Sequence, residues 1–258
     1  MRLTFQSLCS SSAGNCLLLS SDRTTILIDC GFGSQRACRA VLDGYGSKIS
    51  AVLVTHAHGD HMSYSALKVL QGYGATVHCH EDVHDEIEAR HVRRLNSPFR
   101  MSPFSGCDVT IGDFCIKAVR VPHAPGCPTF GFVIRYENSK LVFCTDFHTP
   151  DAIAEHMIDA DFIFVESNHD LELLRKYPNY ASHFHLSNPK SAALLRDTVK
   201  ASRRPPQHVM LGHLSEERNS DKLALKTVRD AFKTGGVDLD FGLTCAPRRG
   251  PSEMIGVG

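Results

Sequence analysis

Residues 51–61 read Ala51-Val52-Leu53-Val54-Thr55-His56-Ala57-His58-Gly59-Asp60-His61. The first four residues are all apolar, which indicates a fully buried β-strand. Directly after it, His56, His58, Asp60 and His61 place four potential metal ligands in one short loop. Imidazole and carboxylate together suit Zn, Mn or Fe better than Ca or Mg. The stretch therefore predicts a metal site at the end of a buried strand.

Three further candidate ligands also follow apolar β-type runs. His123 comes after Val121, Asp146 after Cys144, and His213 after Met210-Leu211-Gly212. Strands that end at one edge of a sheet can present such side chains together. The chain also contains 15 histidines among its 258 residues, which is consistent with metal binding.

With these residues in view, the chain resembles the metallo-β-lactamase superfamily, whose motif is His-x-His-x-Asp-His followed by a further His, a bridging Asp and a last His. The resemblance implies two divalent ions, Zn or Mn with Fe also possible. It assigns the ligands as follows: His56, His58 and His123 to one ion; Asp60, His61 and His213 to the other; Asp146 as the bridge.

The segment Leu27-Ile28-Asp29-Cys30-Gly31 is similar to the early Asp-x-Gly element of the same superfamily. The resemblance makes Asp29 a second-shell carboxylate that orients a ligand imidazole and sets its tautomer. The alternative is an aspartate that only ends a strand in a turn.

The order of the predicted elements favours one domain over residues 1–258 with an αββα architecture, in which two mixed sheets pack together with helices outside. Helices are expected at Gln35–Leu42, Lys190–Lys200 and Asp221–Thr234. The stretch from Asp146 to His213 is too short for the large inserted domain of RNA-end-processing nucleases. Residues 246–258, rich in Pro and Gly, are expected to form a loose tail.

The composition excludes several classes of protein. Lys and Arg (28) balance Asp and Glu (28), so no global basic field attracts nucleic acid or an anionic membrane. The start lacks a signal-peptide core and no stretch is long and apolar enough to span a bilayer, which predicts a cytoplasmic protein. The ten cysteines lack disulfide or zinc spacing. No obligate protein partner is evident.

Asp146 bears on the reaction. Superfamily members that open β-lactams usually resemble this layout but carry Cys at the bridging position. The carboxylate favours a dinuclear phosphodiesterase, in which two ions roughly 3.5–4 Å apart activate a bridging hydroxide for in-line attack on phosphorus. Asp60 is a further candidate to accept the proton of the water. Thioesterases of the glyoxalase II type, cyclic-nucleotide phosphodiesterases, a β-lactamase-type hydrolase and a metal-binding module without activity stay open as alternatives.

Shorter motifs narrow the resemblance. They are Ser10–Asn15, Pro122–Pro125, Glu166–Asp170, His185–Asn188 and Gly212–Glu217. Together they are similar to the WalJ (YycJ)-type branch, which implies a 5′-to-3′ exonuclease acting on DNA with a 5′-phosphorylated end. Ala181–His185 and the residues Phe147-His148 depart from the pattern of that branch.

Some of these motif residues are candidate phosphate ligands. Ser12 and Asn15 lie in a turn whose backbone N–H groups suit an anion, although simple turn chemistry explains them equally well. Asn188 is expected to cap a helix, after Ser187 and with Pro189 at its first position, and such a helix start attracts anions.

His185, just before that helix, is expected to contact the phosphate. His169 is expected to protonate or stabilise the leaving oxygen, with Asn168 beside it, and a structural hydrogen-bonding role is the alternative. No aromatic stacking array stands out in the sequence, and Trp is absent.

Overall fold

The computed structural model describes residues 3–95, 99–106 and 108–258. They form two compact units: unit 1 contains the chain up to Ala118 together with Pro247–Gly258, and unit 2 contains Val119–Ala246. Each unit is described by itself. In the described part of the chain, no helix has the length and apolar character needed to cross a bilayer.

Unit 1 is organised around a seven-stranded sheet with the order β14-β1-β2-β3-β4-β5-β6. The strands are β1 (Leu3–Ser11), β2 (Gly14–Ser20), β3 (Thr25–Ile28), β4 (Ile49–Val54), β5 (Thr76–His80), β6 (Met101–Phe104) and β14 (Ile255–Val257). Strands β3 to β6 are parallel, and β14, β1, β2 and β3 are antiparallel. Ala51–Val54 of β4 are buried, as predicted for a strand inside a covered parallel sheet.

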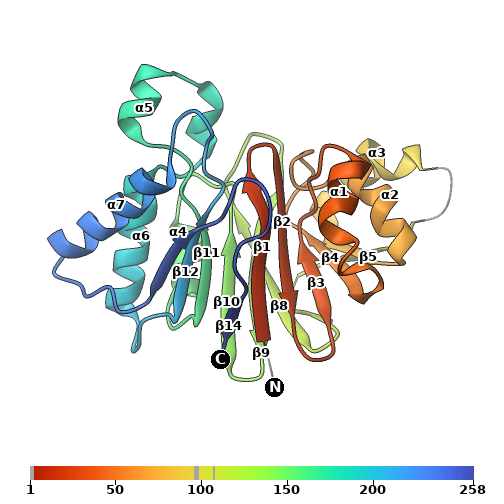
Figure 1. The fold of residues 1–258 in the computed structure, drawn as a ribbon, viewed down its shortest axis with the longest axis horizontal. Helices are drawn as coiled ribbons and strands as arrows, with labels where there is room; N and C mark the ends of the chain where they lie inside the picture. Colours follow the sequence, from red (N-terminus) through yellow and green to blue (C-terminus); the bar gives the residue numbers. More distant parts are fainter. Residues whose placement is uncertain (1–2, 96–98, 107) are drawn as a thin grey trace. The chain divides into compact units, whose positions relative to one another are not determined.

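The helices of unit 1 are α1 (Gln35–Leu42), α2 (Tyr64–Tyr73) and α3 (Glu81–Arg90), with short 3₁₀ turns η1 (Gly46–Lys48) and η2 (Val92–Arg94). They lie together along the first sheet (Figure 1). Ser34 and Ser63 cap α1 and α2 by accepting a backbone N–H bond from the third residue after each cap. Unit 1 thus sets the end of β4 and its loop on a rigid base.

The second sheet has the order β13-β12-β11-β10-β9-β8-β7, and the boundary between the units falls within β8. Its strands are β7 (Val109–Ile111), β8 (Phe114–Val121), β9 (Thr129–Tyr136), β10 (Ser139–Cys144), β11 (Phe162–Glu166), β12 (His208–Gly212) and β13 (Gly242–Cys245). Strands β10 to β13 are parallel, and the register pairs Cys144 with Val165 and Val165 with Leu211. The carboxyl ends of β10, β11 and β12 therefore align at one edge.

The helices of unit 2 are α4 (Asp151–Met157), α5 (Leu171–Lys176), α6 (Asn188–Ala201) and α7 (Asp221–Thr234), with the 3₁₀ segment η3 (Tyr180–Phe184) before α6. Helices α6 and α7 pack on each other, and their apolar residues join the core beneath the sheet. Figure 1 shows α5 projecting beyond the second sheet. The segment from α5 to η3 connects β11 to α6.

The expectation of a loose tail is wrong. Residues 255–257 form β14 and pair antiparallel with β1, and Leu3 lies opposite Val257. Before that strand, the Ser252 N–H donates to the carbonyl oxygen of Ser7, and the Gln6 side chain donates to the carbonyl of Ser252. The Pro and Gly content disfavoured regular structure, but β1 offers an unpaired edge whose backbone groups the tail satisfies.

Candidate metal centre

The loop after β4 gathers four of the predicted ligands into a tight turn, here called the loop cluster: His56, His58, Asp60 and His61. The N–H groups of His61 and Met62 both donate to the carbonyl of His58, which folds the loop back on itself. His56 and His61 are fully buried, and Asp60 is partly exposed. The turn thus confines the polar side chains to a small space.

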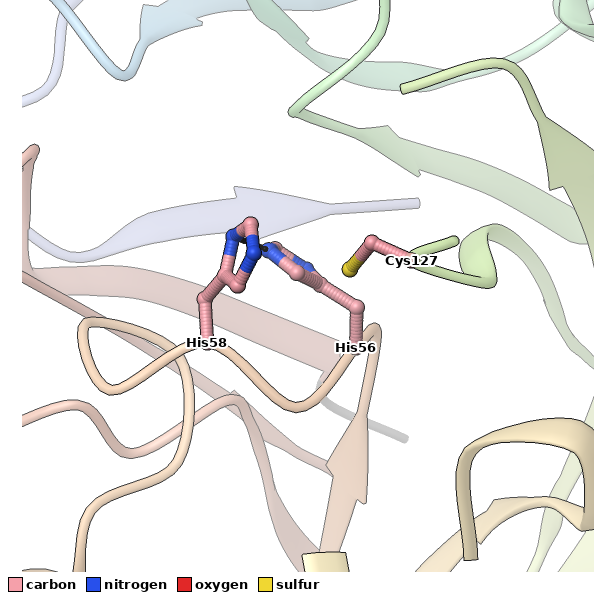
Figure 2. A group of neighbouring side chains, drawn as sticks. All are labelled: His56, His58 and Cys127. Carbon is pink, nitrogen blue, oxygen red and sulfur yellow. Dashed lines mark hydrogen bonds between the residues drawn. The ribbon is translucent and has the colours of Figure 1, made fainter. Parts of the chain in front are cut away.

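Within the loop cluster, His56 and His58 face each other. Figure 2 shows the two rings directed toward one another, with Nε2 of His56 3.0 Å from Nδ1 of His58. Two nitrogen ligands about 2.0–2.1 Å from one tetrahedral ion are about 3.3 Å apart. The pair therefore has a spacing that suits a shared ion.

Asp29 orients the loop cluster. It directly follows β3 and its Oδ2 lies 2.7 Å from Nδ1 of His61. Its Oδ1 accepts the backbone N–H of Thr55, whose hydroxyl also lies 3.0 Å from Nδ1 of His56. Burial raises the pKa of Asp29, and the neighbouring His61 offsets part of that rise. This arrangement fits a carboxylate that fixes the tautomer of a ligand imidazole.

The start of β2, which follows the turn at Ser12, supports the same loop. Asn15 is buried, its N–H donates to the carbonyl of Asp60, and its Nδ2 lies 3.1 Å from Nε2 of His61. Gly31 packs so closely that a Cβ there would lie 1.7 Å from the Asp60 carbonyl oxygen. Ser12, by contrast, is exposed at the tip of the turn. Asn15 therefore holds the ligand loop, whereas Ser12 faces solvent.

In unit 2, several strand ends and the connection from η3 to α6 bring together a second group. It is here called the strand-end cluster and consists of His123, Asp146, Glu166, His185 and His213. Ligand atoms of the last four lie within 4.8 Å of one another. Nε2 of His213 is 3.6 Å from Oδ1 of Asp146, and Nε2 of His123 is 3.9 Å from the same oxygen. The structure thus places the three predicted ligands of unit 2 side by side.

Glu166 is the member of this cluster that the sequence analysis did not single out. It is fully buried at the end of β11, and its Oε1 lies 2.7 Å from Nδ1 of His185 and 2.9 Å from Nδ1 of His213. Its Oε2 accepts the N–H groups of Phe147 and Leu186. An acidic residue at the end of an apolar strand, as at Asp146, was the available signal.

The charges of Glu166 and His185 stabilise each other. Burial alone would raise the pKa of Glu166, but His185 and His213 outweigh it and hold that pKa well below its usual range. Burial would likewise lower the pKa of His185, but Glu166 and Asp146 raise it. His185 therefore carries positive charge more readily than an ordinary histidine.

The other predicted residues of unit 2 lie around this cluster. Asn168 donates from Nδ2 to the carbonyl of His213 at 2.9 Å, so it holds a ligand-bearing turn. His169 is buried, which lowers its pKa, and its Nδ1 lies 3.3 Å from Oδ1 of Asn168. Phe184 offers its carbonyl 3.1 Å from Nδ1 of His123.

The predicted cap of α6 is wrong. Ser187 is the N-cap, Asn188 is the first helical residue and Pro189 is the second. The Asn188 amide cannot cap because its Oδ1 accepts from the hydroxyl of Ser167 at 2.7 Å and from Nδ2 of Asn219 at 2.8 Å. Asn188 thus ties α6 to the end of β11.

The donor set fits divalent metal ions. His123 and His213 direct Nδ1 at a carbonyl or carboxylate oxygen and Nε2 toward Oδ1 of Asp146, the orientation of a ligand imidazole. His61 likewise directs Nδ1 at Asp29, while its Nε2 lies beside the Asn15 amide. Nitrogen and carboxylate oxygen donors in buried positions are typical of Zn, Mn and Fe sites.

A family model described as a β-lactamase superfamily domain matches residues 24–211, which is well over half of the chain. The chain therefore belongs to the metallo-β-lactamase superfamily and is a metal-dependent hydrolase with the αββα sandwich predicted from its sequence. This fold implies divalent metal ions.

More specifically, the chain is similar to the exodeoxyribonuclease YycJ of Bacillus anthracis, with 30% identity over 250 residues that cover 92% of this chain and 91% of the relative. It is also 26% identical to the exodeoxyribonuclease WalJ of Streptococcus pneumoniae serotype 2, over 91% of this chain and 90% of the relative. These matches confirm the resemblance to the WalJ (YycJ)-type branch.

Among solved structures, the metallo-β-lactamase fold protein YhfI from Bacillus subtilis is similar with a TM-score of 0.73. The match covers 98% of this chain and 99% of that one, at 16% sequence identity. Agreement at this level of identity shows the fold alone.

Proposed function

We propose that the chain is a nuclease: a dinuclear metal-dependent phosphodiesterase that acts as a 5′-to-3′ exonuclease on DNA with a 5′-phosphorylated end. The observation that carries the proposal is the buried carboxylate of Asp146, with the Nε2 atoms of His123 and His213 turned toward it. A carboxylate at this position favours phosphoester hydrolysis, and both curated relatives described above are named exodeoxyribonucleases.

The ligand assignment is part of the proposal. His56, His58 and His123 would hold one ion; Asp60, His61 and His213 the other; Asp146 both. Two divalent ions, Zn or Mn with Fe also possible, would supply Lewis-acid stabilisation at phosphorus and a hydrolytic water at neutral pH.

The protein's own groups have distinct proposed roles. Asp60 is the partly exposed carboxylate of its loop and is proposed to accept a proton from the attacking water. His185 retains some solvent exposure and its pKa is raised, so it is proposed to stabilise charge on the phosphate. Burial lowers the pKa of His169, which keeps its ring neutral and able to donate an N–H bond to the leaving oxygen.

The proposed phosphate contacts separate into two kinds. Ser12 is exposed and is proposed to contact the phosphate directly. Asn15, Asn168 and Asn188 have their side chains engaged with neighbouring protein groups, so their proposed contribution is to hold the turns around the phosphate. Ser187 is the N-cap of α6 by position, without a side-chain capping hydrogen bond.

The test is to measure bound metal and then to compare 5′-phosphorylated with 5′-hydroxyl oligonucleotides, as DNA and as RNA, with Mn or Zn added. We expect release of mononucleotides from 5′-phosphorylated DNA. Asp146→Ala should lose at least about 10²-fold in activity, because it removes the carboxylate proposed to hold both ions and with it their stabilisation of charge at phosphorus. The variant should keep its far-UV circular dichroism. Undiminished activity in Asp146→Ala, or turnover of a thioester with none of any oligonucleotide, would contradict the proposal.

A further inference from the structure

A row of aromatic rings, here called the ring row, leads from solvent to the strand-end cluster within unit 2. Tyr180 and Phe184 meet edge to face with ring centroids 5.5 Å apart, and Phe184 lies 6.4 Å from His123. His123 is 5.2 Å from His185, which stacks on His213 at 5.1 Å. No such row stands out in the sequence, because the fold joins rings from three separate segments.

The outer end of the ring row is unusually exposed. Tyr180 is 77% exposed, whereas His213 at the inner end is 1% exposed. Of the four exposed large apolar side chains in the described residues, three (Leu171, Tyr177 and Tyr180) lie on the segment from α5 to η3. Exposed apolar groups gathered in this way mark an interaction surface.

The cations on the connection that carries Tyr180, and at the start of α6, favour unpaired nucleobases over an apolar partner. Arg175, Lys176 and Lys190 are exposed on the same connection and on the first turn of α6. Lys176 lies 5.2 Å above the Tyr177 ring, although Glu172 neutralises part of the charge by pairing with Arg175. Aromatic rings interleaved with cations are typical of single-strand binding, in which bases stack and the backbone is held electrostatically.

We propose that Tyr180, backed by Phe184, is a stacking platform for an unpaired base of single-stranded DNA whose phosphodiester lies at the strand-end cluster. In a duplex the bases are already stacked and paired, so their faces are not offered to a side chain. The platform therefore selects a single strand or a frayed end. This inference rests on the proposed nuclease function and adds the strand preference to it.

The experiment compares Tyr180→Ala, Tyr180→Phe and Met254→Ala on a single-stranded oligonucleotide, on the same sequence as a blunt duplex, and on bis(p-nitrophenyl) phosphate, which carries no base. Loss of one base–aromatic stack is expected to raise KM for the single strand about 10-fold relative to KM for the small ester. Tyr180→Phe keeps the ring and should match the wild type. Met254→Ala is the matched control, because it removes an exposed apolar side chain that lies outside the segment from α5 to η3.

Binding of a labelled single strand to the metal-free protein, followed by fluorescence anisotropy, gives a second readout that does not need turnover. Weaker binding in Tyr180→Ala with retained binding in Tyr180→Phe supports the platform, even if the wild type hydrolyses no phosphodiester, in which case the proposed function alone fails. Equal losses on the oligonucleotide and the small ester would overturn the platform, because Tyr180 would then act only by positioning His123 through Phe184. Unchanged nucleic-acid binding, or a change of oligomeric state in its place, would overturn it as well.

Discussion

The loop cluster and the strand-end cluster use the same kinds of ligand but are built differently. In unit 1, four candidate ligands come from one turn, and Asp29 orients one imidazole among them. In unit 2, the side chains come from separate segments: the parallel register of β10, β11 and β12 aligns Asp146, Glu166 and His213, whereas His123 follows β8 and His185 lies between η3 and α6. There one carboxylate, Glu166, holds two imidazoles. Ligands from one turn are thus held mainly by the turn itself, whereas ligands from separate segments are held by hydrogen bonds to one buried residue, Glu166.

Between the residues that orient ligands in the two clusters, we expect the larger loss of metal affinity and activity for Glu166→Gln. The substitution removes the charge that fixes both His185 and His213, and loss of a partner of this kind typically costs 10–100-fold in metal affinity or activity. We expect the upper end of that range, measured by metal titration and by kcat/KM. Glu155→Gln, an exposed change on α4, is the control. Unaltered metal affinity together with unaltered kcat/KM would refute a positioning role for Glu166.

A smaller effect is expected for Asp29→Asn, since Asp29 orients only His61 directly. The loss should lie near 10-fold, the lower end of the same range, because the Asn side chain can still accept the Thr55 N–H bond. The same metal titration measures it, with the exposed Asp22→Asn as control. A loss larger than that of Glu166→Gln would reverse the proposed order of the two clusters.

The smallest effect concerns a histidine outside both clusters. His208 is the first residue of β12, and its ring stacks on Phe162. Burial lowers the pKa of His208. Below about pH 6.5, His208 therefore binds a proton more readily in the unfolded chain than in the folded protein. The contribution of His208 to the free energy of unfolding is full above that pH and is lost as the pH falls. For one proton, the free energy of unfolding can fall by at most about 1.4 kcal/mol per pH unit. In metal-free protein, His208→Gln should flatten the fall of Tm between pH 6.5 and 5, and an unchanged slope would count against this assignment.

The sequence predicted the elements that carry strong periodicity. Helix α7 has its predicted bounds, and α1 and β4 agree as well. The prediction did not include α4, α5, β6, β13 and β14, all of which are short. The three strands owe their form to tertiary contacts: β6 pairs with β5, β13 with β12, and β14 with β1. The helix or strand propensity of so few residues is too weak to predict such elements from the sequence.

For the candidate site, the contiguous motif identified the loop cluster, and strand ends indicated His123, Asp146 and His213. Glu166 was not predicted as a site residue, because its partners are brought near it by the register of the sheet and not by spacing along the chain. The ring row was not predicted either, because its rings come from separate segments. The sequence also does not show which tyrosines are exposed in the folded protein. The seven ligand assignments and the phosphate contacts remain predictions.

Three of the functional positions share a backbone feature. Asp29, Asp146 and His213 each follow a strand and each adopt a left-handed conformation, with φ of 59°, 60° and 53°. Such residues store on the order of 1 kcal/mol or more unless glycine replaces them. Glycine at these positions would relax the chain and remove a buried polar group while abolishing the ligand or its support. A search for heat-resistant variants that ignores turnover would thus be drawn toward the residues that the chemistry needs, so stability and activity must be selected together in this protein.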